Sequence, residues 1–353
     1  MSRDRLLKAM RLEQTDRVAQ NEWMDHPEFV LKHTGIDPYE QPEKAVVETI
    51  RKFDIDWYVA LPKRANRFDG SETSRKVGDG AYITKFGFTG SYWKHAESEY
   101  ADDETVYGYD PRPAETKEQR EARFAGTVGA IQKDQESVGG LCYISGLYYT
   151  TLFQWFILTF GWEPFLAAAA SEPKKFEAVI ERFTQMSVEY AAYFAKTELP
   201  IFYCHDDLAI TRGLVFPKEW YIKNIFPAYE RIFEPLKKAG KPVIFVSDGN
   251  YLEIIPEILA AGADGLVIDH FTDMDAIMKQ YGGKHPICGN VHIDALTYGT
   301  RDDVKKEVLR CVAYAKRYPG YIIRVSADIP HNIPLENLET YFDCVNEYGR
   351  LAN

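Results

Sequence analysis

Five segments in the second half of the chain each have the pattern of a short apolar β-strand that ends on acidic or imidazole side chains. They are residues 201–207, 243–249, 265–270, 287–292 and 321–328. Parallel strands buried on both faces form continuous runs of valine, isoleucine and phenylalanine, and a barrel of such strands places its reactive groups at the C-terminal strand ends. We therefore expect the functional residues of this chain at the ends of these segments.

Helical segments alternate with the strands. The pattern predicts strands near 17–24 and 55–60 and helices over 2–13, 42–53, 163–171, 173–196, 217–239, 251–261, 273–281, 301–317 and 335–349. Repeated strand–helix units with short loops predict a parallel sheet, and this many units favour a closed (β/α)8 TIM barrel over an open sheet. No GxGxxG motif follows the first strand, so a dinucleotide-binding fold has no support.

The segment from about 65 to 110 differs from the rest of the chain. Glycines such as Gly78, Gly80, Gly87 and Gly90 interrupt β-branched and aromatic residues there. This composition is typical of hairpins rather than of strand–helix units. We therefore predict a single α/β barrel domain over residues 1–353, with an N-terminal β-hairpin insertion at about 65–110.

The charge balance narrows the choice of partners. The chain has a formal net charge of -11, whereas nucleic acids and anionic membranes require a basic face. Five cysteines without a CxxC spacing, a charged N-terminus and the lack of an apolar run of ~18 residues favour a cytoplasmic protein without a membrane span. We expect a small molecule or another protein as partner, and a homodimer is one assembly open to the chain.

Several short motifs follow one another at the expected strand ends and helix starts. They are Asp206-Asp207, Phe216-Pro217, Ser247-Asp248-Gly249, Ala261–Gly265, Gly289-Asn290-Val291, Tyr298-Gly299-Thr300 and Asp328-Ile329-Pro330. Their order and spacing resemble the uroporphyrinogen decarboxylase superfamily, most densely from about residue 200 onward. The resemblance implies a TIM barrel with one of two activities, which are tetrapyrrole decarboxylation and the zinc-dependent exchange of methyl groups with a corrinoid.

Two departures from the family pattern narrow the implied activity. The decarboxylases carry an arginine-rich segment after the first strand that grips substrate carboxylates, whereas Trp23–Glu28 has no arginine. The coenzyme M branch holds zinc with a His-x-Cys and a later cysteine, where this chain has Val246-Ser247-Asp248 and Ala327. Thiol activation favours soft ligands, while polarising an ether oxygen can use oxygen and imidazole donors. The resemblance therefore points to the ether-cleaving corrinoid methyltransferases of O-demethylase systems.

The acidic residues at strand ends are the catalytic candidates. Asp248 is the first choice as metal ligand or acid, and its alternative role is to cap a helix that starts near Tyr251. Asp206 matches the family's strand-end acid, and the alternative for it is a salt bridge to Arg212. Glu22, at the end of the first strand, is either a catalytic group or a carboxylate at the edge of the core.

Histidines and aromatic residues supply the other candidates. The expected zinc ligands are Asp248, His205 and His331, the last because it lies close to the position of the missing cysteine. Aromatic residues can wall a ring or belong to the plain core, and strand-end histidines are often hydrogen-bonded rim residues. The expected substrate-binding residues are Trp23, Tyr148, Tyr149, Trp155, His270, Asn290 and His292.

These candidates fit one reaction. An aryl methyl ether is inert because phenoxide is a poor leaving group, and a Lewis acid or proton donor that stabilises the developing oxyanion makes methyl transfer feasible. We therefore expect a zinc-assisted methyltransferase that acts on a small methoxylated aromatic, with the cob(I)alamin of a corrinoid protein as acceptor. Two alternatives are open, a lyase for a small aromatic or pyrrolic carboxylate and a non-catalytic barrel that binds a corrinoid or tetrapyrrole.

Overall fold

A parallel sheet of seven strands forms the centre of the protein. The computed structural model describes residues 2–63, 75–78, 81–83, 89–91, 102–112 and 115–351. The sheet order is β1–β15–β14–β13–β12–β9–β8. Its strands are β1 (Ala19–Gln20), β8 (Tyr148–Tyr149), β9 (Phe202–His205), β12 (Val243–Ser247), β13 (Gly265–Ile268), β14 (Ile287–Cys288) and β15 (Tyr321–Ile323). All five segments expected as strands in the second half of the chain therefore lie in one sheet.

Two further strands close this sheet into a barrel. β3 (Trp57–Tyr58) pairs in parallel with β7 (Tyr143–Ile144), and a parallel bridge joins Asn21, just after β1, to Trp57. The chain runs from β7 directly into β8, which pairs with β9. The ring β1–β3–β7/β8–β9–β12–β13–β14–β15 is thereby complete, so the predicted (β/α)8 TIM barrel is confirmed.

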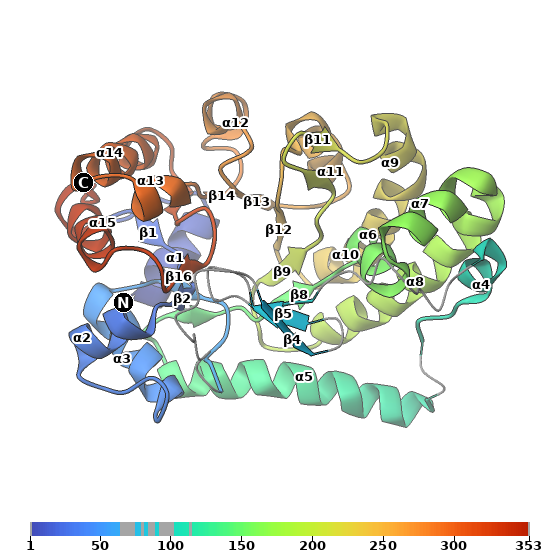
Figure 1. Cartoon of the computed structure of the whole chain (residues 1–353), viewed down its shortest axis with the longest axis horizontal. Coiled ribbons are helices and arrows are strands. Elements are labelled where there is room, and N and C mark those ends of the chain that lie inside the picture. Colours follow the sequence, from blue (N-terminus) through green and yellow to red (C-terminus); the bar gives the residue numbers. More distant parts are fainter. Residues whose placement is uncertain are drawn as a thin grey trace.

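Helices surround the strands, and the long helix α5 runs along one side of the molecule (Figure 1). Within the described ranges, no helix combines the length and the apolar character that crossing a membrane requires. The helices are α1 (Ser2–Met10), α2 (Pro27–Thr34), α3 (Pro42–Phe53), α4 (Asp103–Gly108), α5 (Lys117–Val138), α6 (Phe153–Phe160), α7 (Trp162–Ser171), α8 (Pro173–Phe194), α9 (Lys218–Asn224), α10 (Phe226–Lys238), η1 (Leu252–Ile254), α11 (Ile255–Ala260), α12 (Met274–Tyr281), α13 (Ile293–Tyr298), α14 (Arg301–Arg317) and α15 (Leu335–Tyr348).

The predicted helix over 217–239 is two helices, α9 and α10. Pro227 occupies the first turn of α10, where its missing N–H is not needed. A proline in a helix interior usually disturbs the helix, although α10 accommodates Pro235 in its interior. The chain breaks at Ile225, and the single-helix prediction was wrong at this point.

The predicted insertion contains antiparallel strands. β4 (Arg75–Gly78), β5 (Ala81–Ile83) and β6 (Thr89–Ser91) pair in the order β4–β5–β6, which confirms the expected change from strand–helix units to hairpins. Residues 64–74, 79–80, 84–88 and 92–101 lie outside the described residues. The C-terminal end of the predicted range, at 103–108, forms the helix α4.

Helix α1 closes one end of the barrel. Leu6 and Ala9 of α1 are buried with residues of the barrel interior such as Trp57 and Tyr143. A Cβ at Gly320, the residue before β15, would meet the backbone of Ala9 at 3.2 Å, so α1 lies at the N-terminal ends of the strands. Burying each large apolar side chain of this plug contributes about 1.5–3 kcal/mol. The other end of the barrel, at the C-terminal strand ends, is left for a site.

Candidate active site

A cavity of about 340 Å³ opens at the C-terminal ends of the barrel strands. This volume lies at the lower end of the range of about 300–1,000 Å³ for small-molecule sites. Polar side chains from the ends of β9, β12, β13 and β15 face the same space. They are Tyr203, His205, Asp248, Asp269, His270, Arg324, Ser326 and Asp328.

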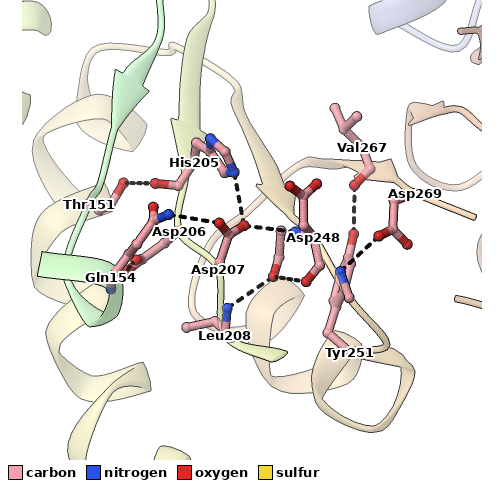
Figure 2. A network of polar contacts seen from close by, with 12 residues as sticks. Thr151, Gln154, His205, Asp206, Asp207, Leu208, Asp248, Tyr251, Val267 and Asp269 are labelled. Carbon is pink, nitrogen blue, oxygen red and sulfur yellow. Dashed lines mark hydrogen bonds and ion pairs between the residues drawn. The ribbon is translucent and has the colours of Figure 1, made fainter. Parts of the chain in front are cut away.

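Three consecutive residues at the end of β9 point in alternating directions. Side chains along a strand alternate between its two faces, so residues two apart share a face. His205 lines the cavity, and its Nε2 lies 2.9 Å from Asp207 Oδ1. The carboxylate of Asp206 points the other way, toward the start of α6 (Figure 2).

Asp207 joins His205 to Asp248, the residue that follows β12. Oδ1 of Asp207 also accepts a hydrogen bond from the backbone N–H of Asp248 at 2.8 Å, and its Oδ2 accepts one from Gln154 Nε2 at 2.8 Å (Figure 2). One ligand atom each of His205, Asp207 and Asp248 lies within 4.8 Å of the others. We call these three residues the strand-end triad.

The electrostatics of the strand-end triad reflect its enclosure. Burial alone lowers the pKa of His205, but the hydrogen bond and charge of Asp207 outweigh burial and raise it. Burial alone raises the pKa of Asp207, and His205 in turn brings it below its usual value. The partial removal of the Asp248 carboxylate from water raises its pKa to about 6, and the negative charge of Asp207 is the second cause. The two carboxylates therefore differ, and Asp248 is the weaker acid.

A glycine turn fixes the position of Asp248. Gly249 has φ +82, a left-handed conformation, and a Cβ there would lie 2.8 Å from the backbone of Ala209. Its N–H donates to Asp269 Oδ2 at 2.8 Å. A residue with a side chain at 249 would have to displace the facing backbone. In the described part of the chain the Asp248 carboxylate accepts no hydrogen bond, and it is exposed to the cavity mouth.

Aromatic residues wall the cavity beside the strand-end triad. Trp23, Tyr149 and Phe271 line it, and the Tyr149 ring stands edge-on to the His205 ring with 4.5 Å between centroids. Of the predicted substrate-binding aromatics, Trp23 and Tyr149 are therefore at the cavity.

Two other predicted aromatics lie away from this cavity. Tyr148 stacks on Tyr190 at 4.1 Å, and its hydroxyl pairs with Ser187. Trp155, on α6, packs near Phe183. Tyr148 and Tyr149 are neighbours on β8 and must face opposite ways, so one of the two could reach the cavity and the other could not.

Asp206 anchors a helix. Its side chain is fully buried, and its two oxygens accept hydrogen bonds from the backbone N–H groups of Leu152, Phe153 and Gln154 and from the hydroxyl of Tyr229, each at 2.7 Å. A carboxylate at a helix N-terminus satisfies otherwise unpaired amides and the helix dipole. We therefore replace the predicted catalytic role of Asp206 with a structural one.

Glu22 is enclosed within the barrel wall rather than at the cavity. Oε1 accepts hydrogen bonds from the Tyr341 hydroxyl and from Gln20 Nε2, and Oε2 accepts one from the Val325 N–H at 3.4 Å. Burial raises the pKa of Glu22 from 4.5 to about 7. Of the two alternatives weighed for this residue, its contacts favour a core carboxylate.

Glu22→Gln is expected to flatten the dependence of stability on pH. Folding raises the pKa of Glu22 from 4.5 to about 7. The contribution of Glu22 to the free energy of unfolding is therefore largest below pH 4.5, and it is lost as the pH rises through 7. The loss is on the order of 3 kcal/mol. Urea unfolding of both proteins between pH 5 and 8.5 measures it, with the exposed Glu40→Gln as control. Parallel curves for wild type and Glu22→Gln would contradict the assignment.

The remaining predicted residues are divided between the cavity and its surroundings. His270 lines the cavity, with Nδ1 3.0 Å from Ser326 Oγ and its ring 4.5 Å from that of His292. Asn290 is buried behind the cavity, where it donates to the Asp269 carbonyl at 2.8 Å. His331, on the loop after β16 (Ile329–Pro330), is outside both the cavity lining and the strand-end triad.

Three residues of the site were not among the predicted ones. Asp207 shares a strand face with His205, so the two-residue period would have selected it in place of Asp206. Arg324 and Asp328 line the cavity at the end of β15. They follow β15, and their place just past the end of a barrel strand is the signal that could have found them.

The strand-end triad suits a divalent metal. Imidazole nitrogen and carboxylate oxygen are both zinc donors, and three protein ligands leave a further position open in a catalytic site. Gln154 and the Asp248 N–H hold Asp207 in place, as outer partners of metal ligands do. The residues therefore fit the predicted zinc site, with Asp207 in the place expected for His331.

Fold and site together define a TIM-barrel protein with a candidate metal centre at the C-terminal strand ends. A family model described as uroporphyrinogen decarboxylase (URO-D) matches residues 158–348, more than half of the chain. The chain belongs to this family, which confirms the resemblance found in the sequence.

Individual relatives show how far the similarity extends. A uroporphyrinogen decarboxylase of Carboxydothermus hydrogenoformans is 27% identical over 142 residues, which are 40% of this chain and 39% of the relative. One of Pelobacter propionicus is 26% identical over 182 residues, 51% of each chain. The chain thus spans about half or less of the length of these relatives. A solved methyltransferase from Methanosarcina mazei covers 98% of both chains with a TM-score of 0.69 at 15% identity, and it shows the shared fold.

Proposed function

We propose that the protein is a methyltransferase that moves the methyl group of a small methoxylated aromatic to the cob(I)alamin of a corrinoid protein, with zinc held by the strand-end triad. The observation that carries the proposal is the position of His205, Asp207 and Asp248 beside an aromatic wall at an open cavity mouth. The Methanosarcina mazei protein of similar fold is a methyltransferase, which agrees with this reaction type.

The cavity favours a small substrate over a tetrapyrrole with many carboxylates. Its volume of about 340 Å³ is at the low end for ligand sites. Asp248, Asp269 and Asp328 line it, against one arginine, Arg324, among the lining residues that are described. A polyanion would meet repulsion from these acids. The name of the decarboxylase relatives is therefore a weaker guide to the substrate than the cavity is.

The proposed reaction breaks the bond between the methyl carbon and the ether oxygen and forms a bond between that carbon and cobalt. The electron pair of the broken bond stays on the oxygen, while cobalt(I) supplies the pair for the new bond. When bound, zinc would act as a Lewis acid toward the negative charge that develops on the oxygen. Trp23 and Tyr149 would orient the ring, and the exposed mouth would admit the corrinoid protein.

Two measurements on protein purified without a tag test the proposal. Elemental analysis is expected to give about one zinc per chain, as a three-ligand site predicts. Cob(I)alamin and a panel of methoxyarenes are expected to give methylcobalamin and the free phenol, with reactions that lack protein as control. Absence of zinc, with no increase in the rate of methyl transfer when zinc is added, would contradict the metal-assisted mechanism. Release of carbon dioxide from an aromatic or pyrrolic acid would favour the lyase.

A further inference from the structure

The guanidinium of Arg324 lies at the floor of the cavity, further from the mouth than the strand-end triad. Arg324 follows β15, and Tyr203 lies two residues before His205 on the same face of β9, about 7 Å deeper along the strand. Arg324 Nη1 donates to the Tyr203 hydroxyl at 3.1 Å and to Asn21 Oδ1 at 3.1 Å. The guanidinium is thereby held in place, with 11% of its side-chain surface exposed.

Part of the hydrogen-bonding capacity of this pair is unused. In the described part of the chain, the Tyr203 hydroxyl makes one hydrogen bond, as acceptor, so its own proton is free to donate. Arg324 Nη2 has one partner there, Asp328 Oδ1, at the long distance of 3.5 Å. A partly buried guanidinium normally finds close charged or bidentate partners. Two donors therefore face the cavity at its floor.

We propose that Arg324 and Tyr203 form an anion-binding subsite that selects substrates with a carboxylate on the aromatic ring. This inference rests on the proposed function and adds the substrate class. The methyl group has to face the mouth, where the corrinoid protein arrives, so the opposite end of the ring lies at the floor. Tyr203 lies about 7 Å along the strand from His205, so the ether and the carboxylate of one substrate would contact different levels of the cavity.

Isothermal titration with 4-methoxybenzoate and 4-methoxybenzamide tests the subsite, because these ligands match in shape and differ in charge. Wild type is expected to bind the acid at least about tenfold more tightly, since hydrogen bonds to charged groups contribute more than neutral ones. Arg324→Met is expected to remove this preference, and Arg324→Lys to retain part of it. Titrations with and without EDTA separate binding at the floor from binding to a metal.

Tyr203→Phe keeps the ring, removes one donor, and is expected to reduce the preference severalfold while the fold is retained. It keeps the inference testable if Arg324→Met does not fold. Arg231→Met, which removes an exposed arginine paired with Glu181, is the matched control. Equal affinity for acid and amide, failure of both to bind, or an unchanged preference in Arg324→Met and Tyr203→Phe would overturn the subsite.

Titration with plain benzoate, together with the methyl-transfer assay, distinguishes this inference from the proposed function. Binding of plain benzoate that depends on Arg324, without methyl transfer from any ether, would support the subsite and reject the methyltransferase. Methyl transfer from methoxybenzamide at the same rate as from methoxybenzoate, with no Arg324-dependent preference, would support the methyltransferase and reject the subsite.

Discussion

Asp248→Asn is expected to abolish zinc-dependent methyl transfer while leaving the protein folded. Asp248 supplies one of the three ligands of the strand-end triad, and in the described part of the chain its carboxylate accepts no hydrogen bond. Loss of an outer partner of a metal ligand already reduces metal affinity about 10- to 100-fold. Loss of the ligand itself should reduce zinc affinity by at least about 100-fold, with a similar loss of rate.

Competition with a chromogenic chelator measures the zinc affinity of Asp248→Asn, and thermal unfolding measures its stability. The exposed Asp302→Asn, on α14, is the matched control and should behave as wild type in both measurements. Without metal, Asp248→Asn should be at least as stable as wild type, because the substitution removes repulsion between Asp248 and Asp207. Full zinc binding and full rate in the variant would mean that the triad is not the metal site.

Asp206→Ala is expected to produce the opposite result, a large loss of stability with a metal site that forms whenever the protein folds. The substitution leaves the amides of Leu152, Phe153 and Gln154 and the hydroxyl of Tyr229 without their acceptor in the interior. Each unsatisfied buried group costs about 1–3 kcal/mol. Relaxation and water entry offset part of this sum, so we expect a decrease of about 4 kcal/mol in the free energy of unfolding.

Urea unfolding without metal measures this decrease. Asp273→Ala is an informative control, because Asp273 caps α12 with a single hydrogen bond, to the Ala276 N–H at 3.1 Å, and such a cap contributes about 1 kcal/mol. Asp206→Ala should be clearly more destabilised than this control. If Asp206→Ala unfolded like wild type but lost methyl transfer, the catalytic role first predicted for Asp206 would be restored.

The barrel was predictable because its strands are continuous apolar runs, such as Val243–Val246, that end abruptly on polar residues. Proline was an ambiguous signal for the helix over 217–239, because Pro227 lies in the first turn of α10 whereas Pro235 lies inside it. The alternation of side chains at the end of β9, and the position of residues just after β15, carried more information about the site than motif matching did. Motif matching selected Asp206, whereas the two-residue period groups His205 with Asp207, and the rule that functional groups follow barrel strands points to Arg324 and Asp328.

Other features depend on how distant segments meet. The enclosure of Glu22 depends on Tyr341 of α15, at the far end of the chain. The position of Arg324 beside Tyr203 depends on β15 and β9 facing each other across the barrel. No local pattern encodes these contacts, because each is set by closure of the ring. His331 was predicted as a zinc ligand because it lies close in sequence to the position of the family's later cysteine. The path of its loop takes it away from the strand-end triad.

The alternation at the end of β9 has a consequence for how this protein could change over time. Substitutions at 205 and 207 would act mainly on turnover, with a smaller cost in stability where the Asp248 N–H and Gln154 lose their acceptor, whereas those at 206 would act mainly on the amount of folded protein. New chemistry could therefore be explored at positions 205 and 207 at a smaller cost in stability than at position 206. A saturation library across 205–207, scored separately for expression and for activity, would display this division residue by residue.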